Sequence, residues 1–228
     1  MMTNIIQKLF FPHYCLLCRE RSGQSMDLCV NCRDALPYLK SACYRCANPI
    51  TIDSAEKLLC PDCLKRMPYF DSSFALCHYQ SRMSLLITRL KFQRQLAYGR
   101  VLADLMGEAC GRLPRPDVLI PVPLHRRRLC ERGFNQAIEI AAPLGKYLDI
   151  PVNRHGCRRI RDTQAQSTLA AKRRHANIKG AFAVVDPIPA HVAIIDDVVT
   201  TGHTVNELSR VLRQAGAEIV QVWSCARA

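Results

Sequence analysis

One stretch in the last third of the chain restricts the possible folds most strongly. Residues 192–195 read Val-Ala-Ile-Ile, and a short apolar run rich in β-branched residues is typical of a strand buried on both faces of a sheet. Two carboxylates, Asp196 and Asp197, follow directly, where we expect the strand to end. A polar turn comes next, and then apolar residues at helical spacing, Val205, Leu208, Val211 and Leu212. A buried strand that passes through a polar turn into a helix predicts an α/β fold with a parallel sheet.

The turn after this strand has the chemistry of a sugar-phosphate site. Its residues are Thr200, Thr201, Gly202, His203 and Thr204. Hydroxyls and the backbone N–H groups at the start of a helix can surround a phosphate, and a glycine lets the backbone approach closely. Ionised Asp196 and Asp197 accept hydrogen bonds only, which suits the hydroxyls of a ribose. An ordinary strand, turn and helix with a polar turn is the alternative. The order of residues resembles the 5-phosphoribosyl-1-pyrophosphate (PRPP) motif of type I phosphoribosyltransferases.

Cysteines near the start of the chain form the second strong pattern. Eight of the thirteen cysteines make four Cys-x-x-Cys pairs. One such pair could be a redox motif, but four close together indicate metal binding. We assign the pairs in sequence to two structural Zn²⁺ sites, Cys15, Cys18, Cys29 and Cys32 around one ion and Cys43, Cys46, Cys60 and Cys63 around the other. A crossed pairing, of the first pair with the third and the second with the fourth, is the alternative.

Length and charge narrow the class of protein. The 228 residues are enough for one α/β domain and a small appendage, and the apolar fraction of 49% allows a proper core. Residues 73–228 carry 23 Lys and Arg against 12 Asp and Glu, which favours a polyanionic partner or a phosphate-rich ligand. No apolar run approaches the ~20 residues of a membrane span, and the start lacks the features of a signal peptide. We therefore expect a cytoplasmic protein without membrane insertion.

Other apolar patterns predict the remaining elements. Strands are expected at residues 74–79, 117–123 and 218–225, with further extended segments within 152–166 and 177–185. Helices are expected over 84–111, with a break near Gly99, over 138–148, and from Ser167.

Arginine and lysine residues cluster between these elements. Arg126, Arg127 and Arg128 follow a predicted strand, and guanidinium groups suit a pyrophosphate, although a solvated basic run is the alternative. Residues 89–94 are either a solvated helix face or a cover for the ligand cleft. Phosphoribosyltransferase topology would bring several basic groups to one rim of the sheet, and we predict that this rim binds DNA through Lys91, Arg94, Arg126, Arg127, Arg128, Arg132, Arg158, Arg159, Arg161, Lys172, Arg173 and Arg174.

Taken together, these blocks resemble the ComF (ComFC/GntX-like) family of bacterial proteins. The resemblance rests on the cysteine pairs, on residues 120–125 (Ile-Pro-Val-Pro-Leu-His) with 131–136 (Glu-Arg-Gly-Phe-Asn-Gln), on 161–166 and 177–182, and on 196–204. It implies a zinc-ribbon segment over residues 1–70 and a type I phosphoribosyltransferase-like domain over 71–228. It also implies a role in natural transformation, in which the protein handles incoming single-stranded DNA in the cytoplasm beside other competence proteins such as a DNA translocase.

The sequence is consistent with three functions. The first is a DNA-handling protein whose fold binds PRPP or DNA phosphates. The second is an active phosphoribosyltransferase, in which Asp196 and Asp197 hold the ribose as catalytic residues, residues 200–204 hold the 5′-phosphate, Arg126–Arg128 hold the pyrophosphate, and Mg²⁺ accompanies PRPP. The third is a zinc-ribbon adaptor with a vestigial ligand site. The basic excess favours the first function, whereas the scarcity of aromatic residues in the basic blocks argues against it.

Overall fold

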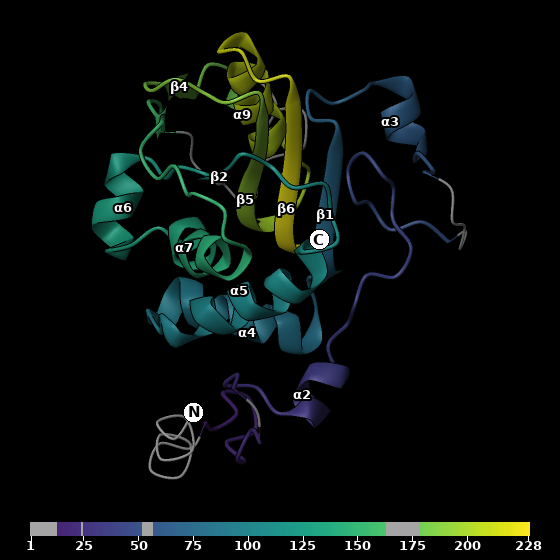
Figure 1. Ribbon diagram of the computed structural model, residues 1–228, viewed down its shortest axis with the longest axis vertical. Coiled ribbons are helices and arrows are strands. Elements are labelled where there is room, and N and C mark those ends of the chain that lie inside the picture. Colours follow the sequence, from purple (N-terminus) through teal and green to yellow (C-terminus); the bar gives the residue numbers. More distant parts are fainter. Residues whose placement is uncertain (1–12, 24, 52–56, 163–177) are drawn as a thin grey trace.

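The computed structural model describes residues 13–23, 25–51, 57–162 and 178–228. Its centre is a parallel four-stranded sheet in the order β1-β6-β5-β2 (Figure 1). The strands are β1 (Ser72–His78), β2 (Val118–Pro121), β5 (His191–Val199) and β6 (Ile219–Arg227). An isolated parallel bridge between Leu119 and Val152 continues the sheet beyond β2. All four strands were predicted from their apolar runs.

Helices cover both faces of the sheet. On one face α4 (Ser81–Gln93), α5 (Ala97–Cys110) and α7 (Gln136–Leu148) share a core with Ala193 and Ile195 of β5. On the other face α9 (His203–Gln214) shares a core with Val192 and Ile194. Successive side chains of a strand point to opposite faces, so the apolar run of β5 supplies both cores. The predicted fold class, a parallel sheet with helices on both faces behind a cysteine-rich segment, is confirmed.

Strand β5 is longer than predicted. It does not end before the acidic pair but continues through Asp196 and Asp197 to Val199. The cause is non-local, because β6 pairs with it along its whole length, from His191 opposite Ile219 to Val199 opposite Arg227. The acidic pair therefore lies inside the sheet, with Asp197 only 2% exposed.

The break between α4 and α5 also differs from the prediction. It falls at residues 94–96, where Arg94 takes a left-handed conformation (φ 54°) that ends α4. Gly99 lies inside α5, where a Cβ atom would stand 3.0 Å from the carbonyl oxygen of Glu139. The glycine therefore permits close packing of α5 against α7 and does not interrupt the helix.

A second, two-stranded antiparallel sheet lies beside the main sheet. Strand β3 (Cys157–Arg159) pairs with β4 (Phe182–Val184), so the extended segments predicted over 152–166 and 177–185 are shorter than expected. The helix predicted from Ser167, which carries Lys172, Arg173 and Arg174, lies outside the described residues.

The cysteine-rich segment contacts the α/β domain at two separate places. The part that contains α2 (Val30–Asp34) packs on α5, where the Tyr98 hydroxyl donates to the Leu16 carbonyl at 3.0 Å and Arg33 pairs with Glu108 at 2.6 Å. The part that contains α3 (Pro61–Lys65) lies near β1 and α9, far from α2 in Figure 1. The boundary at residues 70 and 71 stays a prediction.

Candidate functional site

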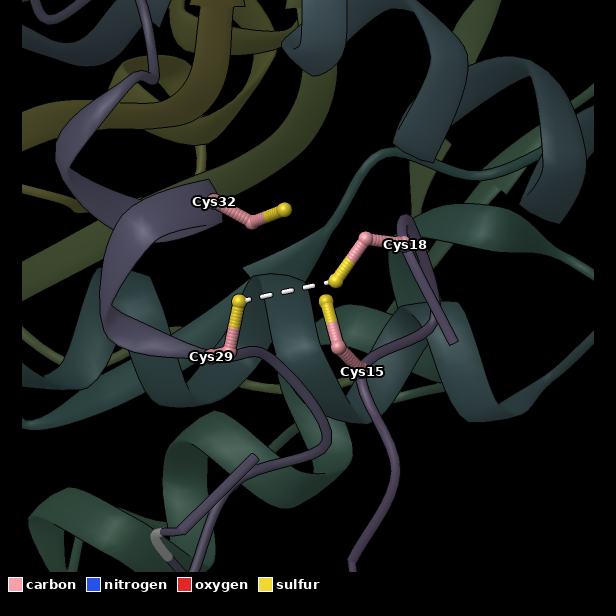
Figure 2. A group of neighbouring side chains, drawn as sticks. All are labelled: Cys15, Cys18, Cys29 and Cys32. Carbon is pink, nitrogen blue, oxygen red and sulfur yellow. Dashed lines mark hydrogen bonds between the residues drawn. The ribbon is translucent and has the colours of Figure 1, made fainter. Parts of the chain in front are cut away.

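The first cysteine cluster has the geometry of a tetrahedral metal site. The sulfur atoms of Cys15, Cys18, Cys29 and Cys32 all lie within 4.8 Å of one another, and Figure 2 shows them pointing toward a common centre. Cys18 and Cys29 have their sulfurs 3.6 Å apart. A Zn–S bond of 2.3 Å gives a tetrahedron with S···S edges of about 3.8 Å. The four thiols therefore fit Zn²⁺ as a closed site with protein ligands only.

The second cluster repeats this arrangement. Its sulfurs, from Cys43, Cys46, Cys60 and Cys63, also lie within 4.8 Å of one another, and those of Cys46 and Cys60 are 3.6 Å apart. This grouping confirms the sequential pairing and excludes the crossed one. Two all-cysteine sites are suited to structural zinc, which contributes folding energy to segments too small to bury a core.

Both clusters are built from the same local structure. The residue after each first Cys-x-x-Cys pair, Arg19 or Ala47, has positive φ (69° and 54°) and donates its N–H to the carbonyl of the first cysteine. The third cysteine of each set, Cys29 or Cys60, caps a short helix. Burial raises the pKa of Cys15, but backbone N–H donors outweigh it and lower the pKa to about 6. Such donors favour the thiolate, which is the form that binds metal.

The acidic pair occupies two different environments on β5. Asp197 forms an ion pair through its Oδ2 with the Nζ of Lys91, which comes from α4. Asp196 accepts a hydrogen bond at Oδ1 from the Asp197 N–H at 2.9 Å, and burial, helped by the negative charge of Asp197, raises its pKa well above the ordinary value. The two adjacent carboxylates thus have different surroundings, because the ion pair with Lys91 is made by Asp197 while burial dominates at Asp196.

Arginines from separate parts of the chain surround this pair. The charge of Asp197 acts on Arg132 of α6 (Arg126–Arg132), and the charge of Asp196 acts on Arg159 of β3. Arg128 lies close enough to lower the pKa of both arginines, for each of which burial is the largest cause of lowering. Folding therefore gathers basic groups from α4, α6 and β3 around two carboxylates at one end of the parallel sheet.

The turn between β5 and α9 has the predicted order of a polar turn with a glycine followed by a helix, and its phosphate ligand stays a prediction. Gly202 caps α9 with φ 74°, so His203 and Thr204 begin the helix, while the side chains of Thr200 and Thr201 are exposed. The N–H groups of the first turn of α9 point toward the loop, as the start of any α-helix requires. We call residues 200–204 the phosphate loop.

Arg227 was missed by the sequence analysis. This nearly buried side chain (8% exposed) donates from Nη1 to the carbonyl of Val199 at 2.9 Å and also to the carbonyl of Thr200. Its Nε donates to the carbonyl of Cys46 at 3.2 Å. The guanidinium therefore joins the phosphate loop to the second cysteine cluster. The available signal was a single charge at the end of an otherwise largely apolar terminal strand.

The arginines predicted for pyrophosphate lie in a short helix and not in an open loop. His125 caps α6 by accepting from the Arg127 N–H, and Gly133 ends it with φ 84°. Arg127 pairs with Glu131 at 3.0 Å and with Asp162 at 3.7 Å. Of Arg126, Arg127 and Arg128, Arg128 is therefore the one that acts on the arginines beside the acidic pair.

The predicted DNA-binding residues divide into two groups. Lys91, Arg132 and Arg159 interact with the acidic pair, Arg128 lies near Arg132 and Arg159, and Arg94 contacts the Glu131 carbonyl at 3.1 Å. Arg158 is exposed on β3, and Arg161 donates to the Lys179 carbonyl at 2.6 Å. An aromatic ring also lies in the first group, since Arg132 stands 5.8 Å from the ring centre of Phe92, whose side chain is 70% exposed. Lys172, Arg173 and Arg174 lie outside the described residues.

The matches to known proteins cover both the cysteine-rich segment and the α/β domain. A family model described as a double zinc ribbon domain matches residues 6–64. Competence protein F of Haemophilus influenzae is 36% identical to 96% of this chain and is covered over 99% of its own length. The chain belongs to the ComF family.

Other relatives of this ComF-family chain carry related names. The DNA utilization protein YhgH of Escherichia coli K12 is 34% identical, with 96% of this chain and 99% of that protein covered. Competence protein ComFC of Streptococcus pneumoniae is 25% identical, with 93% and 99% covered. Among solved structures, one match is glutamine PRPP amidotransferase from B. subtilis, with 18% sequence identity and a TM-score of 0.41. The match covers 61% of this chain and 30% of the amidotransferase chain. Within the described part of this ComF-family chain, no helix is long and apolar enough to cross a membrane.

Proposed function

We propose that this protein handles single-stranded DNA in the cytoplasm during DNA uptake or utilization, and that it binds PRPP or a similar phosphoribosyl group at the phosphate loop. The observation that carries the proposal is the ion pair of Lys91 with Asp197, together with the nearby charges of Arg132 and Arg159, on the strand that leads into the phosphate loop. The names of the relatives, which refer to competence and DNA utilization, support the biological setting.

Each part of a phosphoribosyl ligand has a matching group at this site. The N–H groups at the start of α9 and the hydroxyls of Thr200, Thr201 and Thr204 hold the 5′-phosphate. Asp196 and Asp197 face the ribose hydroxyls, and Arg128 and Arg132 face the pyrophosphate. In this proposal Mg²⁺ arrives on the oxygens of PRPP.

The same basic rim suits a DNA strand. Arg94, Arg126, Arg128 and Arg132 offer charge for phosphates, and the exposed ring of Phe92 offers a face for stacking. If about five phosphates are neutralised, log affinity for a single strand falls with log salt at a slope of about −3.5. In this proposal, a DNA translocase or another competence protein delivers the strand to this protein.

The proposal is tested by measuring binding of PRPP and of single-stranded DNA on one preparation. We expect PRPP to raise the melting temperature, and we expect the double variant Asp196→Asn, Asp197→Asn to lose that protection while it keeps DNA binding. Neutralising Arg126, Arg128 and Arg132 in turn is expected to weaken DNA binding progressively. A protein that binds no single-stranded DNA even at low salt would rule out the DNA role.

An active phosphoribosyltransferase is the second candidate, and the intact acidic pair beside a glycine-containing phosphate loop favours it. In such a transfer, the protein positions the reacting groups and stabilises the charge of the leaving pyrophosphate. Release of pyrophosphate from PRPP in the presence of candidate acceptors, absent from the double aspartate variant, would establish turnover.

A further inference from the structure

A cleft adjoins the phosphate loop. Its volume is about 580 Å³, and it opens between the second cysteine cluster and α9. Thr201, Gly202 and His203 contribute to its wall, but none of Asp196, Asp197, Lys91 or Arg128 does. The cleft therefore shares the phosphate loop with the site described above and is otherwise separate from it.

An aromatic side chain stands in this cleft on a fixed backbone. Tyr69 is 47% exposed. Its N–H donates to the Asn206 side-chain oxygen at 2.7 Å, and its carbonyl accepts from Arg213 Nε at 2.6 Å. Both partners belong to α9, so the backbone of Tyr69 is fixed at the cleft while its side chain is partly exposed. Met67 also lines the cleft and is 53% exposed. An exposed aromatic ring offers a base a face for stacking.

The charged groups of the cleft leave a positive excess. Lys65, Arg66 and Lys179 are exposed in its lining. Of the acidic lining residues, Glu207 receives two hydrogen bonds from Arg210, at 2.7 and 3.0 Å, and one from the Gly180 N–H at 2.7 Å. Its charge is thus compensated within the fold. With Arg227, four cations face Asp62 and the second cysteine cluster, whose four thiolates and one Zn²⁺ have a net charge of −2. The cleft therefore keeps only a small positive excess, and its lining also presents apolar surface.

We propose that this cleft binds a nucleotide unit, with the base stacked on Tyr69 and the phosphate held by Lys65, Arg66 and Lys179. The unit is either a free nucleotide or one residue of a single strand, and both offer the same chemistry. The inference rests on the proposed DNA-handling function in so far as it concerns the strand. A strand bound here would run from the second zinc ribbon to the phosphate loop, so the ribbon would be part of the nucleic-acid site and not only a structural support.

The test uses photocrosslinking with the zinc-loaded full-length protein. Bromodeoxyuridine monophosphate and a short single strand that carries bromodeoxyuridine are irradiated with the protein, and the crosslinked peptide is identified by mass spectrometry. We expect the crosslink at Tyr69 with both probes. We also expect Tyr69→Ala to weaken binding of the mononucleotide about tenfold, the loss of about one stacking contact, and Tyr69→Phe to bind as the parent does.

Matched controls separate this cleft from general surface charge. Tyr14 is 50% exposed on the first ribbon, and Arg82 and Arg112 are exposed away from the cleft. Tyr14→Ala and the double variant Arg82→Ala, Arg112→Ala are expected to bind as the parent does, whereas Lys65→Ala with Lys179→Ala is expected to bind at least about tenfold more weakly.

Each outcome decides between the two proposals. Crosslinks confined to Phe92 and its neighbours, with unchanged binding by the Tyr69 and Lys65/Lys179 variants, overturn the proposal that the cleft binds a nucleotide. The proposed DNA-handling function is then unaffected. A mononucleotide crosslink at Tyr69 without any binding of single strands supports the cleft and rejects the DNA role. Binding of neither probe in the cleft overturns the inference.

Discussion

On β5, two neighbouring carboxylates have different partners. Asp197 makes the ion pair with Lys91, whereas burial and the charge of Asp197 raise the pKa of Asp196. A protonated carboxyl can donate a hydrogen bond as well as accept one. If Asp196 carries its proton, the pair offers the proposed ribose a hydrogen-bond donor as well as acceptors.

Replacing Asp196 by Asn should stabilise the protein at neutral pH. The pKa of Asp196 is higher in the folded than in the unfolded chain, so the folded state binds the proton more tightly. The free energy of unfolding therefore falls as the pH rises from about 3.9, the ordinary value, through the raised pKa. Asp196→Asn removes this loss, which is about 1.4 kcal/mol for each unit of pKa elevation. Urea unfolding of both proteins from pH 4 to pH 8 measures it. Parallel pH profiles for the two proteins would contradict the assignment.

Lys91→Met should destabilise the protein by about 3 kcal/mol, because it leaves the carboxylate of Asp197 buried without its cation. Lys91 itself is 19% exposed, so water offsets part of the loss. Adding Asp197→Asn should restore most of the stability, because no buried charge then remains. Thermal unfolding of the parent, the two single variants and the double variant gives a complete double-mutant cycle. If the two losses simply add, Lys91 and Asp197 do not interact.

At the level of elements, the end of β6 contacts the backbone of the phosphate loop. Arg227 binds two carbonyls of the loop region and one carbonyl of the second cysteine cluster. A single guanidinium thus adds side-chain hydrogen bonds to a turn that Gly202 and the start of α9 also shape.

Arg227→Lys should loosen the phosphate loop, because an ammonium group cannot reproduce the fork of the guanidinium. We expect PRPP or inorganic phosphate to bind about tenfold more weakly, as follows from the loss of one hydrogen bond from a charged group. Arg213→Lys is the control, since Arg213 bonds to Tyr69, Asp71 and Glu218 at the other end of α9. Calorimetric titration with phosphate measures the difference. Equal weakening in both variants would mean that only general stability had changed.

The two cysteine clusters should respond differently to loss of a ligand. Cys46→Ser removes a ligand whose own carbonyl binds Arg227, so it should lower phosphate affinity as well as zinc content. Cys18→Ser lies in the cluster packed against α5 and should lower zinc content and stability but leave phosphate affinity unchanged. Zinc analysis together with phosphate titration of both variants checks this. Identical phosphate affinities in the two variants would remove the link between the second ribbon and the loop.

For the whole molecule, local patterns were enough to find the strands, the main helices and the metal ligands. The apolar run of β5 and the Cys-x-x-Cys spacing are properties of a few neighbouring residues, which is why they could be read directly. The length of β5 could not, because the pairing with β6 that carries it past Asp197 involves residues 28 positions further along the chain. Arg227 and the convergence of Lys91, Arg132 and Arg159 likewise depend on tertiary contacts between distant segments.

The positions of the two ribbons have a consequence for preparations that contain less than the full amount of zinc. Because the clusters contact different parts of the α/β domain, a molecule with one ion exists in two forms that metal analysis cannot tell apart. The form lacking the first ion loses cover from the apolar surface of α5 around Tyr98 and becomes prone to association. The form lacking the second ion stays covered there but loses the anchor behind the phosphate loop. Aggregation and loss of ligand binding would then be separate symptoms of the same shortage, each traceable to its own cluster.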